Sequence, residues 1–256
     1  MERPSDHLLR ITARLTESTD DPTWSRPNVT VRMNLGPAFD DASRVYTVRS
    51  YDSASGSIVV DVVLHGQTSP MMRWAAALAV GDTFGLTGPR PHLIPDVPGR
   101  RIALFLDGTA IPALHSIIEQ LPTDVVGIGW VTTDDEVAFA ELPALPGLEL
   151  HRVSADPTEP DGPLAVRARE LANPASYVVW GAGERNEMRA IRKHFDRPSD
   201  STKTTSRYSD IEGGRQQHRN RPPSTRELRA HPRRRRNPHR HRRPGHRDLI
   251  ASHQPT

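Results

Sequence analysis

Apolar and polar residues alternate along much of the first part of the chain, which is typical of half-buried β-strands. The predicted strands are Leu8–Leu15, Val29–Leu35, Val45–Ser50, Ser57–Leu64 and Thr83–Leu86. Pro70–Leu78 differs, because it opens with proline and is rich in alanine and methionine, a composition that favours a helix. Short strands separated by turn residues predict a small antiparallel β-barrel over residues 1–98.

Residues 99–196 follow a different pattern, in which buried strands alternate with helices. The predicted strands are Arg101–Leu106, Asp124–Val131, Leu148–Val153 and Ser176–Trp180, and the predicted helices are Ile111–Leu121, Leu164–Leu171 and Glu184–Phe195. This alternation predicts an α/β domain with a doubly wound parallel sheet. Ligands of such a sheet bind at the carboxyl ends of its strands.

Charge separates a third region from these two. Residues 197–256 hold 16 Arg and Lys against 5 Asp and Glu, a net charge of +11, whereas residues 1–196 have a net charge of −8. The basic tail is rich in Arg, Pro and His and poor in apolar residues, so it is predicted to be disordered. Nucleic-acid binding through this tail is a weak alternative, because unpatterned basic segments are usually just solvated.

Composition excludes several kinds of chemistry. The 256 residues contain no cysteine, which excludes disulfides, thiolate metal sites, cysteine-ligated clusters and a cysteine nucleophile. The histidines show no metal-binding spacing, so no metal site is predicted. There is neither a long apolar run nor a signal-peptide pattern at the start, so we expect a cytoplasmic protein without membrane insertion.

The strand around Arg44–Arg49 is the first candidate binding segment. Arg44, Tyr46 and Val48 are predicted to share one face, with Thr47 and Arg49 on the other. An arginine beside a tyrosine and a threonine can hold a phosphate, stack on a flat ring and hydrogen-bond its edge. The alternative is an ordinary amphipathic strand with exposed arginines.

A second candidate segment joins a strand to the helix that begins near Pro70. His65, Gly66, Thr68 and Ser69 offer hydroxyl groups and backbone N–H groups at a helix N-terminus, where a phosphate can bind. The alternative is a polar loop in which Ser69 only caps the helix.

Two turns rich in small residues follow strands of the α/β region. One contains Asp107 and Thr109, and the other contains Gly181, Ala182, Gly183 and Glu184. Both lie where a parallel sheet binds a dinucleotide, although neither has the G-x-G-x-x-G pattern. Helix N-capping is the alternative role for Asp107 and Glu184.

Taken together, these segments resemble the siderophore-interacting protein family. The matching motifs are R-x-Y-T-x-R at Arg44–Arg49, VLHG at Val63–Gly66, Trp74-Ala75, Gly81-Asp82, Gly88-Pro89-Arg90, D-x-T-A-I-P-A at Asp107–Ala113 and WGAGE at Trp180–Glu184. The resemblance covers about residues 25–195. It implies a two-domain ferredoxin reductase-like fold, with an FAD-binding β-barrel followed by a domain that binds NADPH or NADH.

The resemblance also implies roles for individual residues. Arg44 would pair with flavin phosphate, Tyr46 would pack on the isoalloxazine ring, and Thr47 would bond near its reactive edge. His65, Gly66, Thr68 and Ser69 would hold the rest of FAD. Asp107, Thr109 and Gly181–Glu184 would face the nicotinamide nucleotide. The implied activity is reduction of a ferric siderophore by NAD(P)H through the flavin, which releases iron because Fe(II) binds a siderophore weakly.

The chain also departs from the family pattern. Ser69-Pro70-Met71 replaces a Gly-Pro-Ala-like stretch, and Gly108 stands where the family has Glu. After Phe195 the family's terminal strand and Tyr-Trp segment are missing, and one hypothesis is that the tail is a frameshifted translation. The tail would then impair the reductase. Two alternatives remain open: a non-catalytic flavin-binding module of the same fold, and a nucleic-acid-associated protein.

Overall fold

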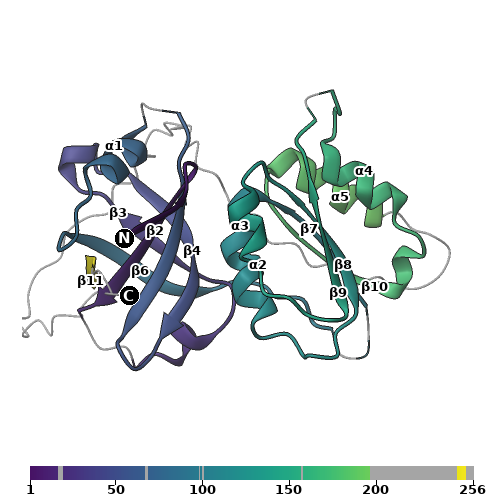
Figure 1. Cartoon of the computed structure of the whole chain (residues 1–256), viewed down its shortest axis with the longest axis horizontal. Coiled ribbons are helices and arrows are strands. Elements are labelled where there is room, and N and C mark those ends of the chain that lie inside the picture. Colours follow the sequence, from purple (N-terminus) through teal and green to yellow (C-terminus); the bar gives the residue numbers. More distant parts are fainter. Residues whose placement is uncertain are drawn as a thin grey trace, which may run out of the picture.

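The computed structural model contains two sheets, one in each part of the chain (Figure 1). It describes residues 1–16, 20–66, 69–97, 99, 101–156, 158–196 and 247–251. The first sheet is antiparallel and forms a barrel, and the second is parallel and carries helices on both faces. The predicted fold class is therefore confirmed for these residues. The domain boundary between 98 and 99 stays a prediction.

The barrel is built from seven strands and one α-helix. Its elements are β1 (Glu2–Ser5), β2 (Leu8–Leu15), β3 (Val29–Asn34), β4 (Ser43–Asp52), β5 (Ser57–Val63), α1 (Pro70–Ala77), β6 (Thr83–Pro91) and β11 (Arg247–Ala251). The sheet order is β1-β2-β11-β6-β3-β4-β5, and pairing of β2 with β5 closes it. Side chains that alternate inward, such as Ile11, Val31 and Ile58, fill the interior and are almost fully buried.

One strand of this barrel comes from the basic tail. Strand β11 pairs with Ala13–Leu15 of β2 and with Thr83–Leu86 of β6, in both cases antiparallel (Figure 1, yellow). The sequence prediction of a disordered tail over 197–256 did not include this strand. The other residues of that range lie outside the described part of the chain.

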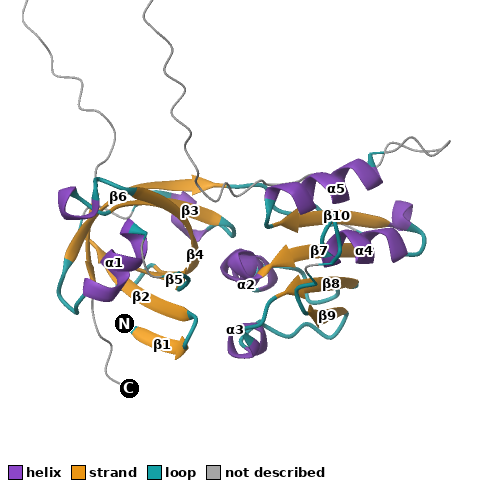
Figure 2. Cartoon of the chain, turned by 90° about the horizontal axis from the view of Figure 1, so that it is seen from above, coloured by secondary structure: helices purple, strands orange, loops and turns teal. Residues whose placement is uncertain are grey.

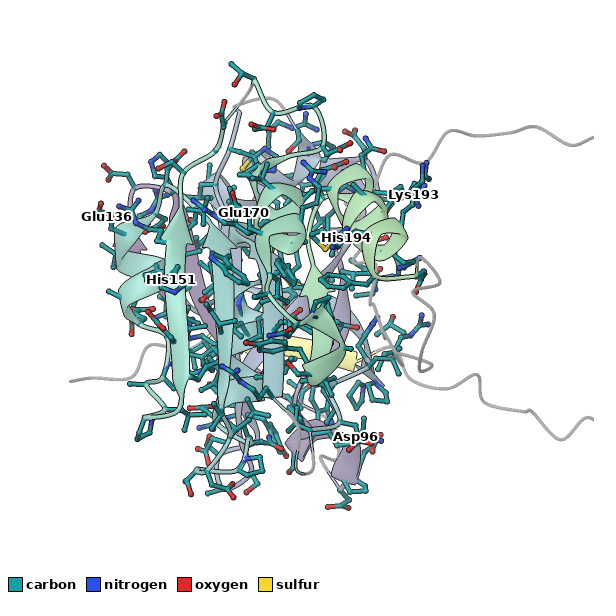
Figure 3. All side chains as sticks on the ribbon, turned by 90° about the vertical axis from the view of Figure 1, so that its right-hand side faces the viewer. Asp96, Glu136, His151, Glu170, Lys193 and His194 are labelled. Carbon is teal, nitrogen blue, oxygen red and sulfur yellow. The ribbon has the colours of Figure 1, made fainter. Side chains whose placement is uncertain are left out.

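The second part of the chain is a four-stranded parallel sheet in the order β10-β7-β8-β9. Its strands are β7 (Arg101–Asp107), β8 (Gly127–Thr132), β9 (Leu148–Val153) and β10 (Tyr177–Ala182), and its α-helices are α2 (Ile111–Ile118), α3 (Glu136–Ala140), α4 (Pro163–Glu170) and α5 (Arg185–Phe195). Helices α2 and α3 lie on the side of the barrel, and α4 and α5 cover the opposite face (Figure 2). Figure 3 shows His151 on the edge strand β9, with Lys193 and His194 near the end of α5.

Each face of the parallel sheet has its own core, because successive side chains of a strand point to opposite faces. Leu104, Leu106 and Trp180 pack toward α2, whereas Phe105 and Val179 pack toward α4 and α5. The near-continuous apolar run of β7 reflects burial on both sides. Helix α2 in turn packs against β4, so the barrel and the α/β domain share an interface.

Besides β11, the sequence pattern missed two short elements. Helix α3 has only five residues and strand β1 only four, too few for a periodic pattern to show. The longer elements were found: β2 spans Leu8–Leu15 as predicted, and α5 begins one residue after the predicted start. Strand β4 carries a bulge between Val48 and Ser50, which the sequence pattern does not reveal.

Candidate functional site

The candidate flavin-binding strand β4 presents its residues in three different environments. The Arg44 Nη1 donates to the carbonyl oxygen of the neighbouring Ser43 at 2.8 Å, and its charge lies close enough to Tyr46 to lower the pKa of that hydroxyl in part. Tyr46 packs partly against the barrel core, and burial raises the pKa of its hydroxyl. Thr47 is buried opposite Thr30 of β3. The segment therefore offers a half-exposed cation and a half-buried aromatic ring on one strand.

The last motif residue, Arg49, does not fit the alternative of an ordinary strand with exposed arginines. It is buried, and its guanidinium pairs with Asp61 of β5 at 3.1 Å and with Glu141 after α3 at 3.2 Å. For this residue that alternative is wrong, because Arg49 faces the α/β domain instead of solvent.

The loop after β5 leads to the N-terminus of α1. His65 and Gly66 are exposed, and Gly66 has a φ of +42°, a left-handed conformation that favours glycine. Ser69 is the N-cap of α1, since its Oγ accepts a hydrogen bond from the N–H of Met72 at 3.2 Å. Thr68 lies outside the described residues. Capping by Ser69 is therefore observed, and phosphate binding at this loop stays a prediction.

The two small-residue turns of the α/β domain meet at the carboxyl edge of its sheet. A Cβ atom added at Gly183 would lie 2.8 Å from Oδ2 of Asp107, so these residues, 76 positions apart in the chain, are in contact. Asp107 caps a short 3-10 helix by accepting from the N–H and Oγ1 of Thr109, at 2.9 and 2.6 Å. Burial raises the pKa of Asp107, and the bonds from Thr109 lower it in part.

Helix α5 begins directly after the second turn. The N-cap Glu184 accepts from the N–H groups of Asn186 and Glu187, at 2.7 and 3.0 Å. Helix capping is therefore an observed role of both Asp107 and Glu184. A Cβ atom at Gly181 would lie 3.0 Å from the carbonyl oxygen of Phe105. The close packing of β10 against β7 is therefore sufficient reason for a glycine at this position.

A cleft of about 240 Å³ lies between the barrel and the carboxyl edge of the parallel sheet. The barrel lines it with His7, Leu8, Val63 and Leu64, and the α/β domain lines it with Gly108, Ile111, Thr133, Asp134, Asp135 and Ala138. Val63 and Leu64 precede the candidate phosphate loop, and Gly108 belongs to the Asp107 turn. The cleft therefore lies next to both predicted ligand-binding regions, and its lining consists of neighbours of the predicted site residues and not of those residues themselves. A second hollow, of about 420 Å³, lies on the barrel among α1, β3 and β6, and none of the predicted site residues lines it.

The sequence missed the acidic side of the cleft. Asp134 and Asp135 follow β8, as Asp107 ends β7, so the rule that ligands bind at the carboxyl ends of parallel strands could have found them. His7 and Leu8 carried no signal, because only tertiary packing brings the start of β2 to this edge.

The residues present fit a flavin dinucleotide in their chemistry. Arg44 supplies a cation for phosphate, Tyr46 a ring face, and the glycine-containing loop before α1 supplies backbone N–H groups. Within the described ranges, no group of three or more His, Asp or Glu side chains could hold a metal ion. None of the helices described is long and apolar enough to cross a membrane.

An antiparallel barrel followed by a parallel α/β sheet, with a cleft where the two meet, is a ferredoxin reductase-like fold. Solved structures share this fold: ferredoxin–NADP+ reductase from Plasmodium falciparum is 11% identical, with a TM-score of 0.54 over 75% of this chain and 92% of that one. Two family models match the sequence, the Siderophore-interacting FAD-binding domain over residues 2–93 and the Siderophore-interacting protein over residues 99–209. The chain belongs to the siderophore-interacting protein family.

Individual relatives agree with this assignment. The ferric acinetobactin reductase of Acinetobacter baumannii is 32% identical over 199 residues, which cover 76% of this chain and 69% of the relative. The ferric vibriobactin reductase ViuB of Vibrio cholerae is 28% identical, over 62% of this chain and 60% of that protein. The solved siderophore-interacting protein from Acinetobacter baumannii is 30% identical with a TM-score of 0.75, and the match covers 82% of this chain and 86% of that one.

The comparisons confirm the resemblance and lengthen it. The family matches begin at residue 2 and run to residue 209, whereas the sequence prediction placed the resemblance at about 25–195. The expectation that the match ends near Phe195 was therefore too short.

Proposed function

We propose that this chain is an FAD-dependent reductase that uses a pyridine nucleotide to reduce ferric siderophores. The observation that supports it best is the cleft, which joins the end of β5 in the barrel to the Asp107 turn of the parallel sheet. The names of the related acinetobactin and vibriobactin reductases supply the substrate class. The chain spans about two thirds of their length, so the whole activity is part of the proposal.

In this proposal the barrel holds FAD and the α/β domain holds NADPH or NADH. When bound, FAD converts a two-electron hydride donor into a source of single electrons for Fe(III). Arg44, Tyr46 and Thr47 bind and orient the flavin. His65, Gly66, Thr68 and Ser69 complete its phosphate site.

The nucleotide site consists of Asp107, Thr109, Gly181, Ala182, Gly183 and Glu184. Gly183 brings the second turn into contact with Asp107, so the two turns form one continuous edge against which a nucleotide can lie. The use of NADPH or NADH, and the cytoplasmic location, stay predictions from the sequence.

The decisive experiment is an anaerobic titration of the purified full-length protein. A flavoprotein absorbs at about 450 nm, and this band must bleach when NADPH or NADH is added if the nucleotide supplies the electrons. A ferric siderophore added next must restore the band and release Fe(II), detected with a ferrous-specific chelator. A yellow protein that neither nucleotide bleaches would instead be the non-catalytic flavin-binding module. A colourless protein that takes up no FAD would contradict both interpretations.

Substitution of Arg44 tests the flavin site. A charge-assisted hydrogen bond contributes about 1.5–3 kcal/mol, so Arg44→Ala is expected to raise the dissociation constant of FAD by about tenfold or more. Arg14→Ala removes an exposed arginine from strand β2 of the same barrel and serves as the matched control. FAD affinity is measured by flavin fluorescence quenching. Equal affinities of the two variants would show that Arg44 does not contribute to FAD binding.

A further inference from the structure

Four charged side chains join the barrel to the α/β domain. Arg10 of β2, Arg49 of β4 and Asp61 of β5 belong to the barrel, whereas Glu141 follows α3. Asp61 accepts from Nε and Nη2 of Arg10, at 2.7 and 3.0 Å, and from Nη1 of Arg49 at 3.1 Å. We call these four residues the interdomain cluster.

Glu141 is bound as tightly as Asp61, although it comes from the other domain. Its Oε2 accepts from Nη2 of Arg10 at 2.6 Å and from Nη2 of Arg49 at 3.2 Å, and its Oε1 accepts from Nη1 of Arg10 at 3.1 Å. Three hydrogen bonds to two planar guanidinium groups set the position and the orientation of this carboxylate. The hydrogen bond from Arg10 also lowers the pKa of Glu141, which keeps it ionised.

Charge balance makes Glu141 the member on which the contact depends. The side chains of Arg10, Arg49 and Asp61 are 14%, 7% and 1% exposed, and together they carry a net charge of +1. Glu141, 31% exposed, brings the cluster to zero. His115 of α2 is also close enough to feel the charges of Arg10, Arg49 and Asp61. Its own ionic neighbour is Glu119, whose Oε2 lies 3.6 Å from Nδ1 of His115. Unbalanced charge is costly away from water. The net charge of +1 on the barrel side therefore favours the position of the α/β domain in which Glu141 pairs with Arg10 and Arg49.

The interdomain cluster lies beside the cleft between the barrel and the α/β domain. Strand β2 carries Leu8, which lines the cleft, and Arg10, which binds Glu141. Helix α3 likewise carries Ala138 in the cleft and ends beside Glu141. A shift of Glu141 against Arg10 must therefore move one wall of the cleft against the other.

We propose that Glu141 is a positioning residue, which sets the orientation of the α/β domain relative to the barrel and thereby the approach of nucleotide to flavin. This inference rests on the proposed function for its catalytic consequence. Hydride transfer requires reacting atoms about 3–3.5 Å apart, and a misplacement of about 1 Å can lower the rate 100-fold. In this proposal the cluster acts through geometry, and its four residues lie beside the cleft and not in its lining.

Glu136, the first residue of α3, provides a matched control for Glu141, which directly follows that helix. It pairs with Arg152 of β9, so both partners belong to the α/β domain. Figure 3 shows Glu136 at the outer margin of that domain. Glu136→Gln and Glu141→Gln remove the same charge at the two ends of α3, but only the second removes a contact with the barrel.

The orientation can be measured without any activity. The chain has no cysteine, so Ser53→Cys in the barrel and Arg189→Cys on α5, both exposed, introduce the only two labelling sites. Double electron–electron resonance between two spin labels should give one narrow distance distribution for the parent and for Glu136→Gln. Glu141→Gln should broaden or shift it, and Glu141→Asp, which keeps the charge, should restore it in part. Identical distributions for all four proteins would overturn the inference.

Flavin reduction gives the second readout. In anaerobic stopped-flow experiments with NADPH and with NADH, Glu141→Gln should lower the rate of flavin reduction at saturating nucleotide roughly tenfold or more, whereas Glu136→Gln should match the wild type. Reduction by dithionite, which needs no nucleotide site, should be equal in all variants. If Glu141→Gln reduces at the wild-type rate, the inference is wrong. If neither nucleotide reduces the wild type, the proposed function is wrong, and the distance measurement alone decides the role of Glu141.

Discussion

Asp61→Asn is the sharpest test of how the interdomain cluster is stabilised. The substitution keeps the size of the side chain but removes its charge, and it places an amide N–H₂ group against guanidinium donors. Asp61 is the most buried member, and it accepts three hydrogen bonds from Arg10 and Arg49. Loss of one partner of a buried ion pair costs about 3–5 kcal/mol. Glu141 still neutralises part of the charge, so we expect a value near the lower end.

Thermal unfolding, followed by circular dichroism, measures this loss. A destabilisation of about 3 kcal/mol should lower the midpoint by roughly 6–12 °C, at about 2–4 °C per kcal/mol for a chain of this size. Asp52→Asn is the control, because Asp52 is the exposed last residue of β4 and its carboxylate accepts hydrogen bonds from the nearby Ser55 and Ala54. Its midpoint should change by no more than about 2 °C, since exposed substitutions are usually within about 0.5 kcal/mol.

A triple variant separates two physical causes. Arg10→Met, Arg49→Met and Asp61→Leu together remove all buried charges of the barrel side, and Glu141 can then turn to water. If the loss in Asp61→Asn comes from unpaired buried arginines, the triple variant should be more stable than Asp61→Asn. A triple variant that is less stable than Asp61→Asn, or a single variant that unfolds like Asp52→Asn, would refute the reasoning.

Two further predictions concern the edge of the parallel sheet. Gly183→Ala places a Cβ atom 2.8 Å from Oδ2 of Asp107, so we expect a loss of about 1–3 kcal/mol in unfolding free energy, and slower reduction by nucleotide with unchanged FAD content. Normal reduction kinetics would show that Gly183 lies away from the nucleotide. Glu187 is buried against the N–H of Leu164, and burial raises its pKa. The folded state then resists its ionisation, so the wild type should lose stability as the pH rises above about 4.5, the ordinary pKa of Glu. Glu187→Gln should therefore gain stability relative to the wild type at pH 7 and not at pH 4 in urea unfolding, and an equal difference at both values would contradict this.

Much of the fold could be predicted from the sequence, because its longer elements bury one face or both. The alternation in Leu8–Leu15 and the apolar run that begins at Arg101 reflect local contact with a core, and each stands as predicted. Helix α3 was missed, since five residues held by Asp135 as N-cap show no period. Yet α3 ends beside Glu141 and carries part of the cleft, so a short element takes part in the domain contact.

The candidate site was predicted in pieces. The Asp107 and Gly183 turns follow buried strands, and their meeting at one edge is a consequence of parallel topology. The capping roles of Ser69, Asp107 and Glu184 were open alternatives, and the structure shows them. Their contacts with ligands stay predictions, because capping and ligand binding use the same polar groups.

The sequence by itself determined the local structure, the acidic body with its basic tail, and membership of the siderophore-interacting protein family through motifs in register. Only the tertiary structure decided which charges pair. Arg49 stands in a recognisable motif, but its partners lie 12 and 92 positions away, and Arg10 reaches Glu141 across 131 positions. Strand and helix periods arise between neighbours in the chain, whereas an ion pair between domains exists only where packing removes water from both partners. For that reason the cluster beside the cleft is visible in the fold and absent from the pattern.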